Sequence, residues 1–170
     1  MLEIGVQTGA SVKLWLDYFT EAQIYGVDTD DDFKSDHPRY HFIKGDQGKR
    51  AFWRTVNQDF DLIIDDGSHM VSDVVASFES LWSKLKDGGI YVIEDVFTFF
   101  HPHFSKNSFG PNWLLSFIGA VNLNGKYFYG NPGTIPPNQP LDDLESGIEW
   151  VQFHKGLVII KKRTGEPNLL

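Results

Sequence analysis

The chain has 170 residues, of which 41% are hydrophobic and 22% charged, and this composition predicts one packed domain over residues 1–170. A formal net charge of −8 argues against a nucleic-acid backbone or an anionic membrane surface as the main partner, and the lack of cysteine excludes disulfides, thiolate nucleophiles and cysteine-ligated metals. No apolar run approaches the roughly 20 residues of a membrane span and no secretory signal is visible, so we expect a cytoplasmic protein.

Short apolar runs recur through residue 95, rich in β-branched and aromatic residues and mostly followed by Gly, Asp or Glu. Runs of this length without strict alternation are typical of strands that are buried on both faces, as in a parallel sheet. We therefore expect strands at Leu2–Ile4, Ala22–Val27, Tyr40–Ile43, Phe60–Ile64 and Ile90–Ile93.

Amphipathic segments separate these runs. Val12–Phe19 carries its apolar residues on one stripe, which predicts a helix. The same spacing predicts a helix over Ser72–Leu85, and Gly88-Gly89 follows where a glycine cap commonly ends a helix. Lys49–Val56 is a further, shorter helix candidate.

The alternation of strands and helices predicts right-handed βαβ units and an α/β fold with a doubly wound, mostly parallel, Rossmann-like sheet. After residue 95, Trp113–Val121 is a helix candidate and Gly130–Pro140 has the composition of a loop. Ile148–Phe153 and Leu157–Lys162 flank the tight turn His154-Lys155-Gly156. They predict an antiparallel hairpin at one edge of the sheet.

A glycine-rich turn follows the first predicted strand and opens the first predicted helix: Glu3-Ile4-Gly5-Val6-Gln7-Thr8-Gly9-Ala10-Ser11. Gly5 and Gly9 would let the backbone approach a ligand closely. Gln7 stands where a dinucleotide-binding turn usually has glycine. A plain strand-to-helix turn explains the same residues, so this motif alone identifies no ligand.

Acidic and amide side chains follow the second and third predicted strands. Asp28 stands where a carboxylate can accept hydrogen bonds from both hydroxyls of a ribose. Asp46 is a candidate partner for an adenine amino group and Gln47 for fixing the base, because doubly wound sheets bind ligands at the carboxyl ends of their strands. Asp30–Asp32 would repel a pyrophosphate but not a cationic ligand, although a solvated charged turn explains this run as well.

Five ionisable residues follow the fourth and fifth predicted strands. Asp65, Asp66 and His69 come after one strand, and Glu94 and Asp95 after the other. We expect these strands to be neighbours, so that the four carboxylates and the imidazole meet at one edge of the sheet. Such carboxylates repel one another and raise one another's pKa, and a divalent cation removes this conflict.

The hard oxygen ligands of Asp66, Glu94 and Asp95 suit Mg²⁺, Mn²⁺ or Ca²⁺. His69 is a candidate general base, because an imidazole exchanges its proton near neutral pH. The alternatives are a helix cap at Asp65, loop amides bonded to Asp66 and an ordinary surface role for His69.

The sequence resembles the class I S-adenosylmethionine (SAM)-dependent methyltransferases. Within them it is similar to the metal-dependent sugar O-methyltransferases of macrolide biosynthesis and their cephalosporin-hydroxylase-like relatives. The matching segments are LEIGVQTGAS, GVDTD, KGDQ, FDLIIDDGSH and LKDGGIYVIEDV, with a weaker match at TFFHP. The likeness extends over nearly the whole chain, and its specific part is the pair IDDGSH and VIED.

The resemblance implies the class I methyltransferase fold with a SAM site and a Mg²⁺ site. The SAM site would comprise Glu3, Gly5, Gly9, Ser11, Asp28, Asp46, Gln47 and Asp65. The Mg²⁺ ligands would be Asp66, Glu94 and Asp95, with His69 as the catalytic base. The implied activity transfers the methyl group of SAM to a hydroxyl of a small molecule, a sugar or another vicinal diol or catechol-like acceptor.

One departure concerns the helices that relatives carry before their first strand, where they help to cover SAM and build the acceptor pocket; this sequence begins at that strand. A lid from a partner subunit, and hence a homo-oligomer, is compatible with this start. The alternative function is a non-catalytic SAM-binding module reduced from a methyltransferase. An NAD-type oxidoreductase is disfavoured by Gln7, and a metal-dependent hydrolase leaves the glycine turn unexplained.

An aromatic stretch, Phe97–Trp113, follows the acidic edge and is the candidate acceptor region, since aromatic faces stack on sugar or phenolic rings. For Phe97 and Trp113 we favour packing of the last helix onto the sheet. For His101 and His103 we favour surface positions, because no carboxylate accompanies them.

Overall fold

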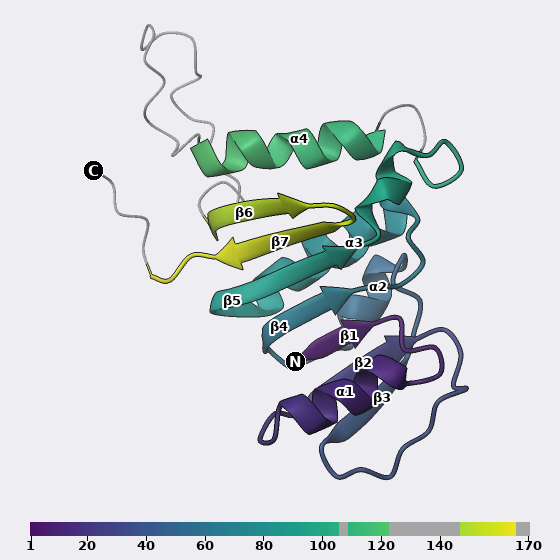
Figure 1. Ribbon diagram of the computed structural model, residues 1–170. Helices are drawn as coiled ribbons and strands as arrows, with labels where there is room; N and C mark the ends of the chain where they lie inside the picture. The colour runs from purple at the N-terminus through teal and green to yellow at the C-terminus, as the bar shows by residue number, and fades with distance from the viewer. Residues whose placement is uncertain (106–108, 123–146, 166–170) are drawn as a thin grey trace, which may run out of the picture.

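A computed structural model describes residues 1–105, 109–122 and 147–165. Within these residues seven strands form one sheet in the order β3-β2-β1-β4-β5-β7-β6 (Figure 1). The strands are β1 (Leu2–Ile4), β2 (Ile24–Asp28), β3 (Tyr40–Lys44), β4 (Phe60–Asp65), β5 (Leu85–Glu94), β6 (Ile148–His154) and β7 (Leu157–Lys162). The helices are α1 (Ala10–Tyr18), α2 (Arg50–Trp53), α3 (Val71–Leu81) and α4 (Phe109–Asn122), with 3₁₀ turns η1 (Trp82–Lys84) and η2 (Val96–Phe100).

Neighbouring strands from β3 to β5 run parallel, whereas β7 pairs antiparallel with both β5 and β6. The predicted α/β fold, a doubly wound and mostly parallel sheet with a C-terminal antiparallel hairpin, is therefore confirmed. The strand order reverses at β1, which pairs with β2 on one side and with β4 on the other. Ligands of such sheets bind beyond the carboxyl ends of the strands at this switch point.

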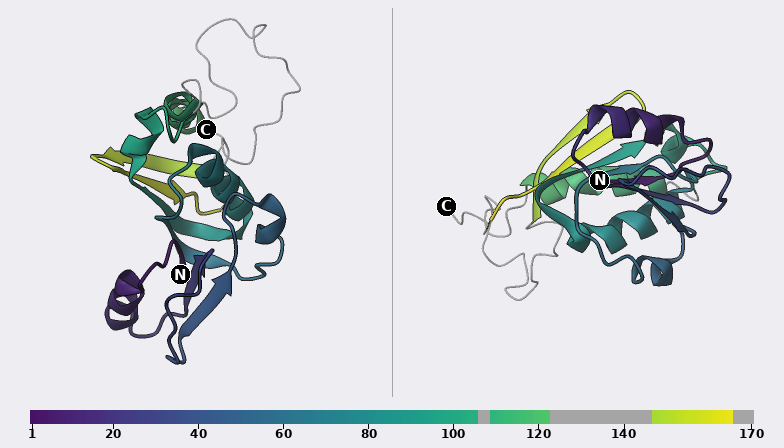
Figure 2. Two further views of the ribbon diagram at one scale, coloured as in Figure 1. Left: turned by 90° about the vertical axis from the view of Figure 1, so that its right-hand side faces the viewer. Right: turned by 90° about the horizontal axis from the view of Figure 1, so that it is seen from below.

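Helices cover both faces of the sheet. Figure 2 shows α1 on one face and α2 and α3 on the other. The rings of Trp113 and Phe117 contact that of Phe78, so α4 packs on the α3 side. Side chains of β1 divide between the two faces, because successive residues of a strand point to opposite sides. Leu2 joins the core on the α3 side, and Glu3 points to α1.

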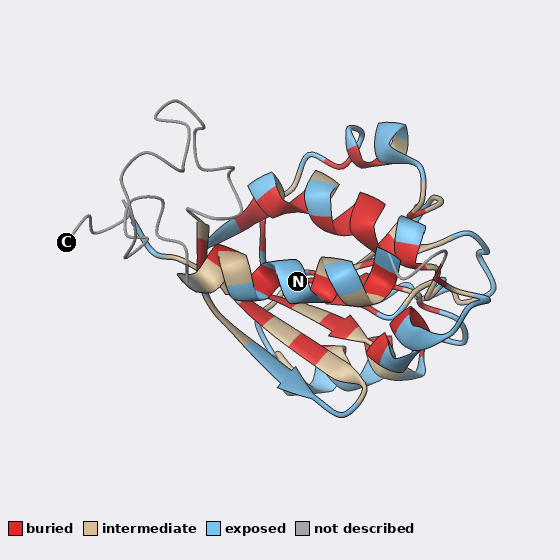
Figure 3. Cartoon of the chain, turned by 90° about the horizontal axis from the view of Figure 1, so that it is seen from above, coloured by how far each residue is buried: buried red, intermediate tan, exposed pale blue. Residues whose placement is uncertain are grey.

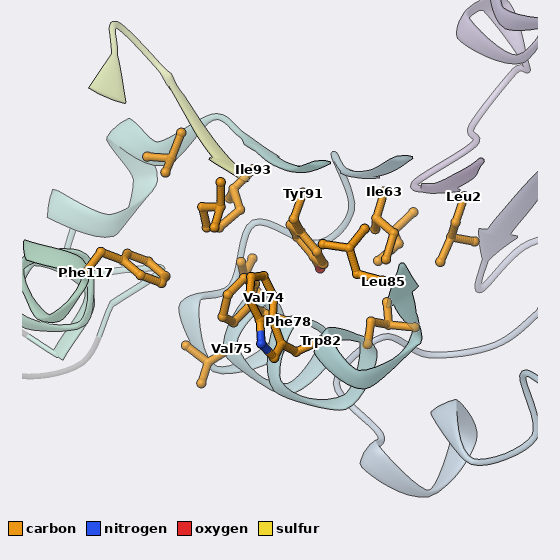
Figure 4. Packing of buried hydrophobic residues seen from close by; sticks show 14 of the residues in the cluster. Leu2, Ile63, Val74, Val75, Phe78, Trp82, Leu85, Tyr91, Ile93 and Phe117 are labelled. Atoms are coloured by element: carbon orange, nitrogen blue, oxygen red, sulfur yellow. The ribbon is translucent and has the colours of Figure 1, made fainter. Parts of the chain in front are cut away.

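The larger of the two apolar cores lies between the sheet and α3. Phe78 is fully buried there, and Figure 4 shows it beside Trp82 and Tyr91, whose rings it contacts. Its ring also contacts those of Trp113 and Phe117. Buried and exposed residues alternate along the helices in Figure 3, so that each helix presents one side to the interior. This core includes residues of β4 and β5, the two strands whose carboxyl ends lead to the acidic residues.

The boundary between α3 and β5 differs from the prediction. The helix predicted over Ser72–Leu85 ends at Leu81, and η1 follows it. The glycine pair that was expected to cap this helix lies within β5 instead. Lys162 on β7 donates hydrogen bonds to the carbonyls of Trp82 and Leu85, which holds the chain in the turn that leads into β5.

Other element bounds differ less. α1 and α4 begin before the predicted helices Val12–Phe19 and Trp113–Val121, and α2 is shorter than the predicted Lys49–Val56. The predicted loop Gly130–Pro140 lies outside the described residues. None of the described helices combines the length and the apolar character needed to cross a membrane.

We expect Phe78→Ala to lower the free energy of unfolding by about 3–5 kcal/mol, because it leaves a cavity among four aromatic rings that cannot collapse fully. Urea denaturation followed by fluorescence measures the change. The matched control is Leu115→Ala on α4, a residue 60% exposed, which should stay within about 0.5 kcal/mol of wild type. Equal effects of the two substitutions would contradict this view of the core.

Candidate functional site

The carboxyl ends of β1, β4 and β5 lie together on the right in Figure 1, at the same side as the ends of β2 and β3. A pocket of about 230 Å³ opens at these ends. Its lining comes from the glycine turn after β1, from the end of β2 and from the loops after β3 and β4, and includes Gly5, Gln7, Asp28, Asp46 and Asp66. The pocket therefore lies at the switch point of the sheet, where a ligand is expected.

The glycine turn packs directly against the loop after β4. Gly5 has a φ of +91°, and a Cβ atom there would lie 2.1 Å from the carbonyl oxygen of Asp66. Its amide donates a hydrogen bond to the carbonyl of Val27 on β2. Gly9, at the start of α1, has a φ of +73°, and a Cβ atom there would lie 2.2 Å from the ring of Phe33. Close packing requires glycine at both positions.

Asp28 binds the glycine turn through its carboxylate. Oδ2 accepts hydrogen bonds from the amides of Val6 and Gln7 at 2.8 and 2.9 Å, and Oδ1 accepts one from Asp30 at 3.2 Å. Burial alone would raise the pKa of Asp28, but these backbone hydrogen bonds outweigh it and hold the pKa below its ordinary value. Asp28 is thus an ionised acceptor at the wall of the pocket.

Three side chains form a cluster with the geometry of a metal site. Asp66, His69 and Asp95 each offer a ligand atom, and these atoms lie within 4.8 Å of one another. The Nε2 atom of His69 is 3.6 Å from Oδ2 of Asp95. β4 and β5 pair directly, with Asp65 opposite Ile93, which brings the loops that carry the cluster together as predicted.

The backbone is strained at this edge of the sheet. Among the described residues, the non-glycine positions with positive φ are Gln7 (45°), His69 (58°) and Asp95 (51°). Each lies in the pocket wall or in the metal-type cluster. Left-handed conformations of such residues cost free energy and persist where the surroundings enforce them, commonly at functional sites.

Glu94 lies near the cluster, although its carboxylate is not one of the three groups that converge. Burial is the main cause that raises the pKa of Glu94, and repulsion from Asp66 and Asp95 raises it further. Burial likewise raises the pKa of Asp66; His69 opposes this shift and Asp95 adds to it. The site therefore concentrates negative charge, and a cation would lower its energy.

Asp65 points away from the pocket, on the α3 side of the sheet. It is 1% exposed, and its carboxylate accepts hydrogen bonds from Ser77, Gln47 and Tyr91. Burial raises the pKa of Asp65 to about 6, and the hydrogen bonds only partly offset this effect. Gln47 is also buried, and its side-chain oxygen accepts a hydrogen bond from the amide of Ser68 at 2.6 Å. Direct contact of these two side chains with a ligand stays a prediction.

Glu3 is buried between β1 and α1. Its Oε1 atom accepts a hydrogen bond from the indole of Trp15 at 3.0 Å, while Oε2 is buried without a hydrogen-bond partner among the described residues. Burial raises the pKa of Glu3, an effect that the Trp15 and Ser11 side chains oppose and that Asp66 strengthens. A donor group of a ligand would satisfy the free oxygen atom.

Asp46 is half-exposed at the pocket wall. Its Oδ1 atom accepts a hydrogen bond from the amide of Gly48, and Lys49 lies 3.8 Å from Oδ2. Within the run Asp30–Asp32, Asp31 forms exposed ion pairs with Lys34 and Lys44. This contact fits the solvated charged turn that the sequence left open.

Residues 2–96 match the family described as "Methyltransferase domain". The chain belongs to this methyltransferase-domain family. Its fold is that of the class I methyltransferases, as the resemblance implied.

Curated relatives of the domain are named as O-methyltransferases. The 8-demethyl-8-alpha-L-rhamnosyl tetracenomycin-C 2'-O-methyltransferase of Streptomyces olivaceus is 32% identical over 99% of this chain and 47% of its own length. The mycinamicin VI 2''-O-methyltransferase of Micromonospora griseorubida is 39% identical over 61% of this chain and 29% of its own length. The chain thus spans less than half the length of these relatives.

Solved structures similar to this chain are also methyltransferases. The MycE methyltransferase from the mycinamycin biosynthetic pathway, in complex with Mg and SAH, aligns with a TM-score of 0.81 at 29% identity, over 99% of this chain and 46% of that chain. A putative ribosomal RNA methyltransferase from Plasmodium falciparum shares the fold, with a TM-score of 0.58 at 12% identity.

Sequence reasoning missed some features of the methyltransferase domain's site. The predicted meeting of the His69 imidazole with the carboxylates is confirmed by the cluster, but the left-handed backbone of His69, with a φ of 58°, gave no signal in the sequence. Ser77 and Tyr91, the partners of Asp65, gave no signal among other helix and strand residues.

Residues 97–105 and 109–113 of the aromatic stretch are among the described residues. Trp113 packs against Phe78, Phe99 and Phe117, as favoured, but Phe97 is 62% exposed, so its expected packing role is wrong. η2 directs the Phe97 ring toward the turn at Gly156. His101 and His103 are exposed, as expected.

We expect the free energy of unfolding of wild type, relative to Asp65→Asn, to fall as pH rises from about 4 to 7. The folded protein binds the Asp65 proton more tightly than the unfolded chain does, with a pKa of about 6 against 3.8. The contribution is full below the unfolded pKa and lost as pH rises through the folded pKa. The difference should change by up to about 3 kcal/mol. Urea denaturation of both proteins across this pH range measures it, and a constant difference would contradict the raised pKa.

Proposed function

We propose that this methyltransferase domain is a Mg²⁺-dependent, SAM-dependent O-methyltransferase acting on a hydroxyl of a sugar or of another vicinal diol or catechol-like acceptor. The observation that carries the proposal is the position of Asp66, which lines the pocket at the switch point and also belongs to the metal-type cluster. A pocket for the methyl donor and a cation site thus share one side chain. The names of the curated relatives, which act on sugars, support the acceptor class.

For SAM, we assign the pocket residues and their neighbours as the binding set. Asp28 would accept hydrogen bonds from the ribose, and Asp46 from the adenine amino group, as both line the pocket. Glu3, Gly5, Gly9 and Ser11 would serve the rest of the cofactor. Gln47 would shape the pocket wall that it lines, and Asp65 would act from the core through its hydrogen bond with Gln47. SAM supplies the methyl group on its sulfonium and leaves as S-adenosylhomocysteine. A cytoplasmic location and a self-associated form remain predictions.

For Mg²⁺, the donor set fits. Asp66 and Asp95 offer hard oxygen atoms, and Glu94 adds charge beside them. Bound Mg²⁺ lowers the pKa of a hydroxyl that it contacts, which makes that hydroxyl a better nucleophile at neutral pH. Burial is the main cause of the raised pKa values of Asp66 and Glu94, and a cation beside these carboxylates would favour their ionised forms.

His69 is the proposed general base. Asp95, 3.6 Å from Nε2, orients the ring and stabilises the imidazolium that forms when His69 takes the proton of the acceptor hydroxyl. Both residues have left-handed backbone conformations, which are uncommon outside glycine and often occur at functional sites. The exposed Phe97, two positions after Asp95, offers an apolar face to the acceptor's body.

We expect His69→Ala to lower kcat by at least about 100-fold while the Kd for SAM stays within about twofold, because the base acts on the acceptor and not on the donor. Steady-state kinetics on a panel of sugars and catechols and calorimetric titration with SAM measure the two effects. The control is His41→Ala, a histidine of β3 that bonds Gln23 far from the cluster. Equal loss of SAM affinity and turnover would contradict the assignment.

Removal of divalent cations with EDTA should abolish methyl transfer, because without the cation no positive charge lowers the pKa of the acceptor hydroxyl. Added Mg²⁺ should restore the activity. Asp66→Asn should raise the Mg²⁺ concentration needed for half-maximal rate by more than tenfold. Turnover that is indifferent to chelation would remove Mg²⁺ from the mechanism. Binding of SAM without product on any acceptor would instead favour a binding module.

A further inference from the structure

The loop that carries Asp66 and His69 also contains Ser68, whose backbone amide donates a hydrogen bond to the side chain of Gln47. The acceptor is Oε1 of Gln47, at 2.6 Å. Gly67, the residue before Ser68, packs against the same oxygen, since a Cβ atom at Gly67 would lie 1.8 Å from it. Gln47 comes from the loop after β3, so it ties the pocket wall to the metal-type loop.

The orientation of the Gln47 amide is set by Asp65. Nε2 of Gln47 donates to Oδ1 of Asp65 at 3.0 Å. A carboxylate only accepts hydrogen bonds, so Gln47 must turn its NH₂ group toward Asp65 and its oxygen toward the Ser68 amide. If the Gln47 amide were reversed, its oxygen would face the Asp65 carboxylate, acceptor against acceptor. Its NH₂ group would face the Ser68 amide, donor against donor.

Asp65 is oriented in turn by two hydroxyls in the core. Ser77 on α3 donates to Oδ2 at 2.6 Å, and Tyr91 on β5 donates to the same atom at 3.2 Å. Ser77 and Tyr91 are both fully buried. A buried hydrogen bond adds little net stability, but a buried polar group that loses its partner costs much free energy. A connected set of buried hydrogen bonds therefore chiefly holds its side chains in one arrangement.

We propose that Ser77 and Tyr91 are positioning residues for the metal site: through Asp65 and Gln47 they fix the Ser68 amide, and with it the loop that presents Asp66 and His69. The inference deepens the proposed function and rests on it for the identity of the cation. Neither Ser77 nor Tyr91 needs to contact the cation, the donor or the acceptor.

The test compares Ser77→Ala and Tyr91→Phe with matched controls. Ser105→Ala removes a buried serine hydroxyl that accepts a hydrogen bond from the backbone amide of Gly110. Tyr40→Phe removes a buried hydroxyl that has no hydrogen-bond partner among the described residues. Mg²⁺ is titrated calorimetrically into each protein in the presence of S-adenosylhomocysteine. Amide hydrogen exchange at Ser68 is measured on the same proteins without any ligand.

We expect both network variants to raise the Kd for Mg²⁺ by about 10- to 100-fold, the usual effect of removing an outer hydrogen bond of a metal site, and to speed exchange at Ser68 by at least about tenfold. The controls should stay within about twofold for both quantities. Tyr91→Phe keeps the shape of the core, so it gives the result even if Ser77→Ala does not fold. Network variants that behave like their controls in both measurements would overturn the proposal.

A second comparison separates action through Gln47 from a general loosening of the core. In a Gln47→Leu background, Ser77→Ala should change the Kd for Mg²⁺ by less than about twofold, because the connection to Ser68 is already broken. A full additional loss would overturn the proposed connection. A wild-type protein that binds no Mg²⁺ would contradict the proposed function, and exchange at Ser68 would then decide alone whether the network holds the loop.

Discussion

Repulsion between carboxylates at the neighbouring ends of β4 and β5 is the constraint on which the rest of the site depends. Asp66 and Asp95 are brought within ligand distance of one another, and Glu94 adds its charge. The parallel pairing of the two strands places the loops that carry these groups side by side. The fold therefore gathers negative charge that a cation would offset, and Asp66 carries part of this charge at the wall of the pocket at the switch point.

The alternation of side chains along β4 and its loop gives adjacent carboxylates different tasks. Asp65 points into the core and is satisfied by Ser77, Tyr91 and Gln47. Asp66, one position later, faces the pocket and the cation site. The side chain of Asp65 thus belongs to the packed interior, whereas that of Asp66 belongs to the pocket. The core around Phe78 packs against the strands that carry both residues.

Much of this was readable from the sequence, because short apolar runs and their acidic ends follow from strand burial and strand direction. The predicted strands, the hairpin and the meeting of two acidic ends are confirmed. The end of α3 was not readable, since it depends on Lys162, distant in the chain. Nor were the left-handed backbone of His69 and Asp95 or the buried position of Asp65, because these depend on the course of the loops and not on residue type.

The central claim is that a dication sits between the loops after β4 and β5 beside the adenosyl pocket. A crystal grown with Mn²⁺ and S-adenosylhomocysteine tests it most directly, because anomalous scattering locates the ion without assumptions about its ligands. The account predicts a peak about 2.0–2.3 Å from carboxylate oxygens of Asp66 and Asp95, with the nucleoside at Asp28. A peak elsewhere, or a nucleoside bound away from the switch point, would contradict it.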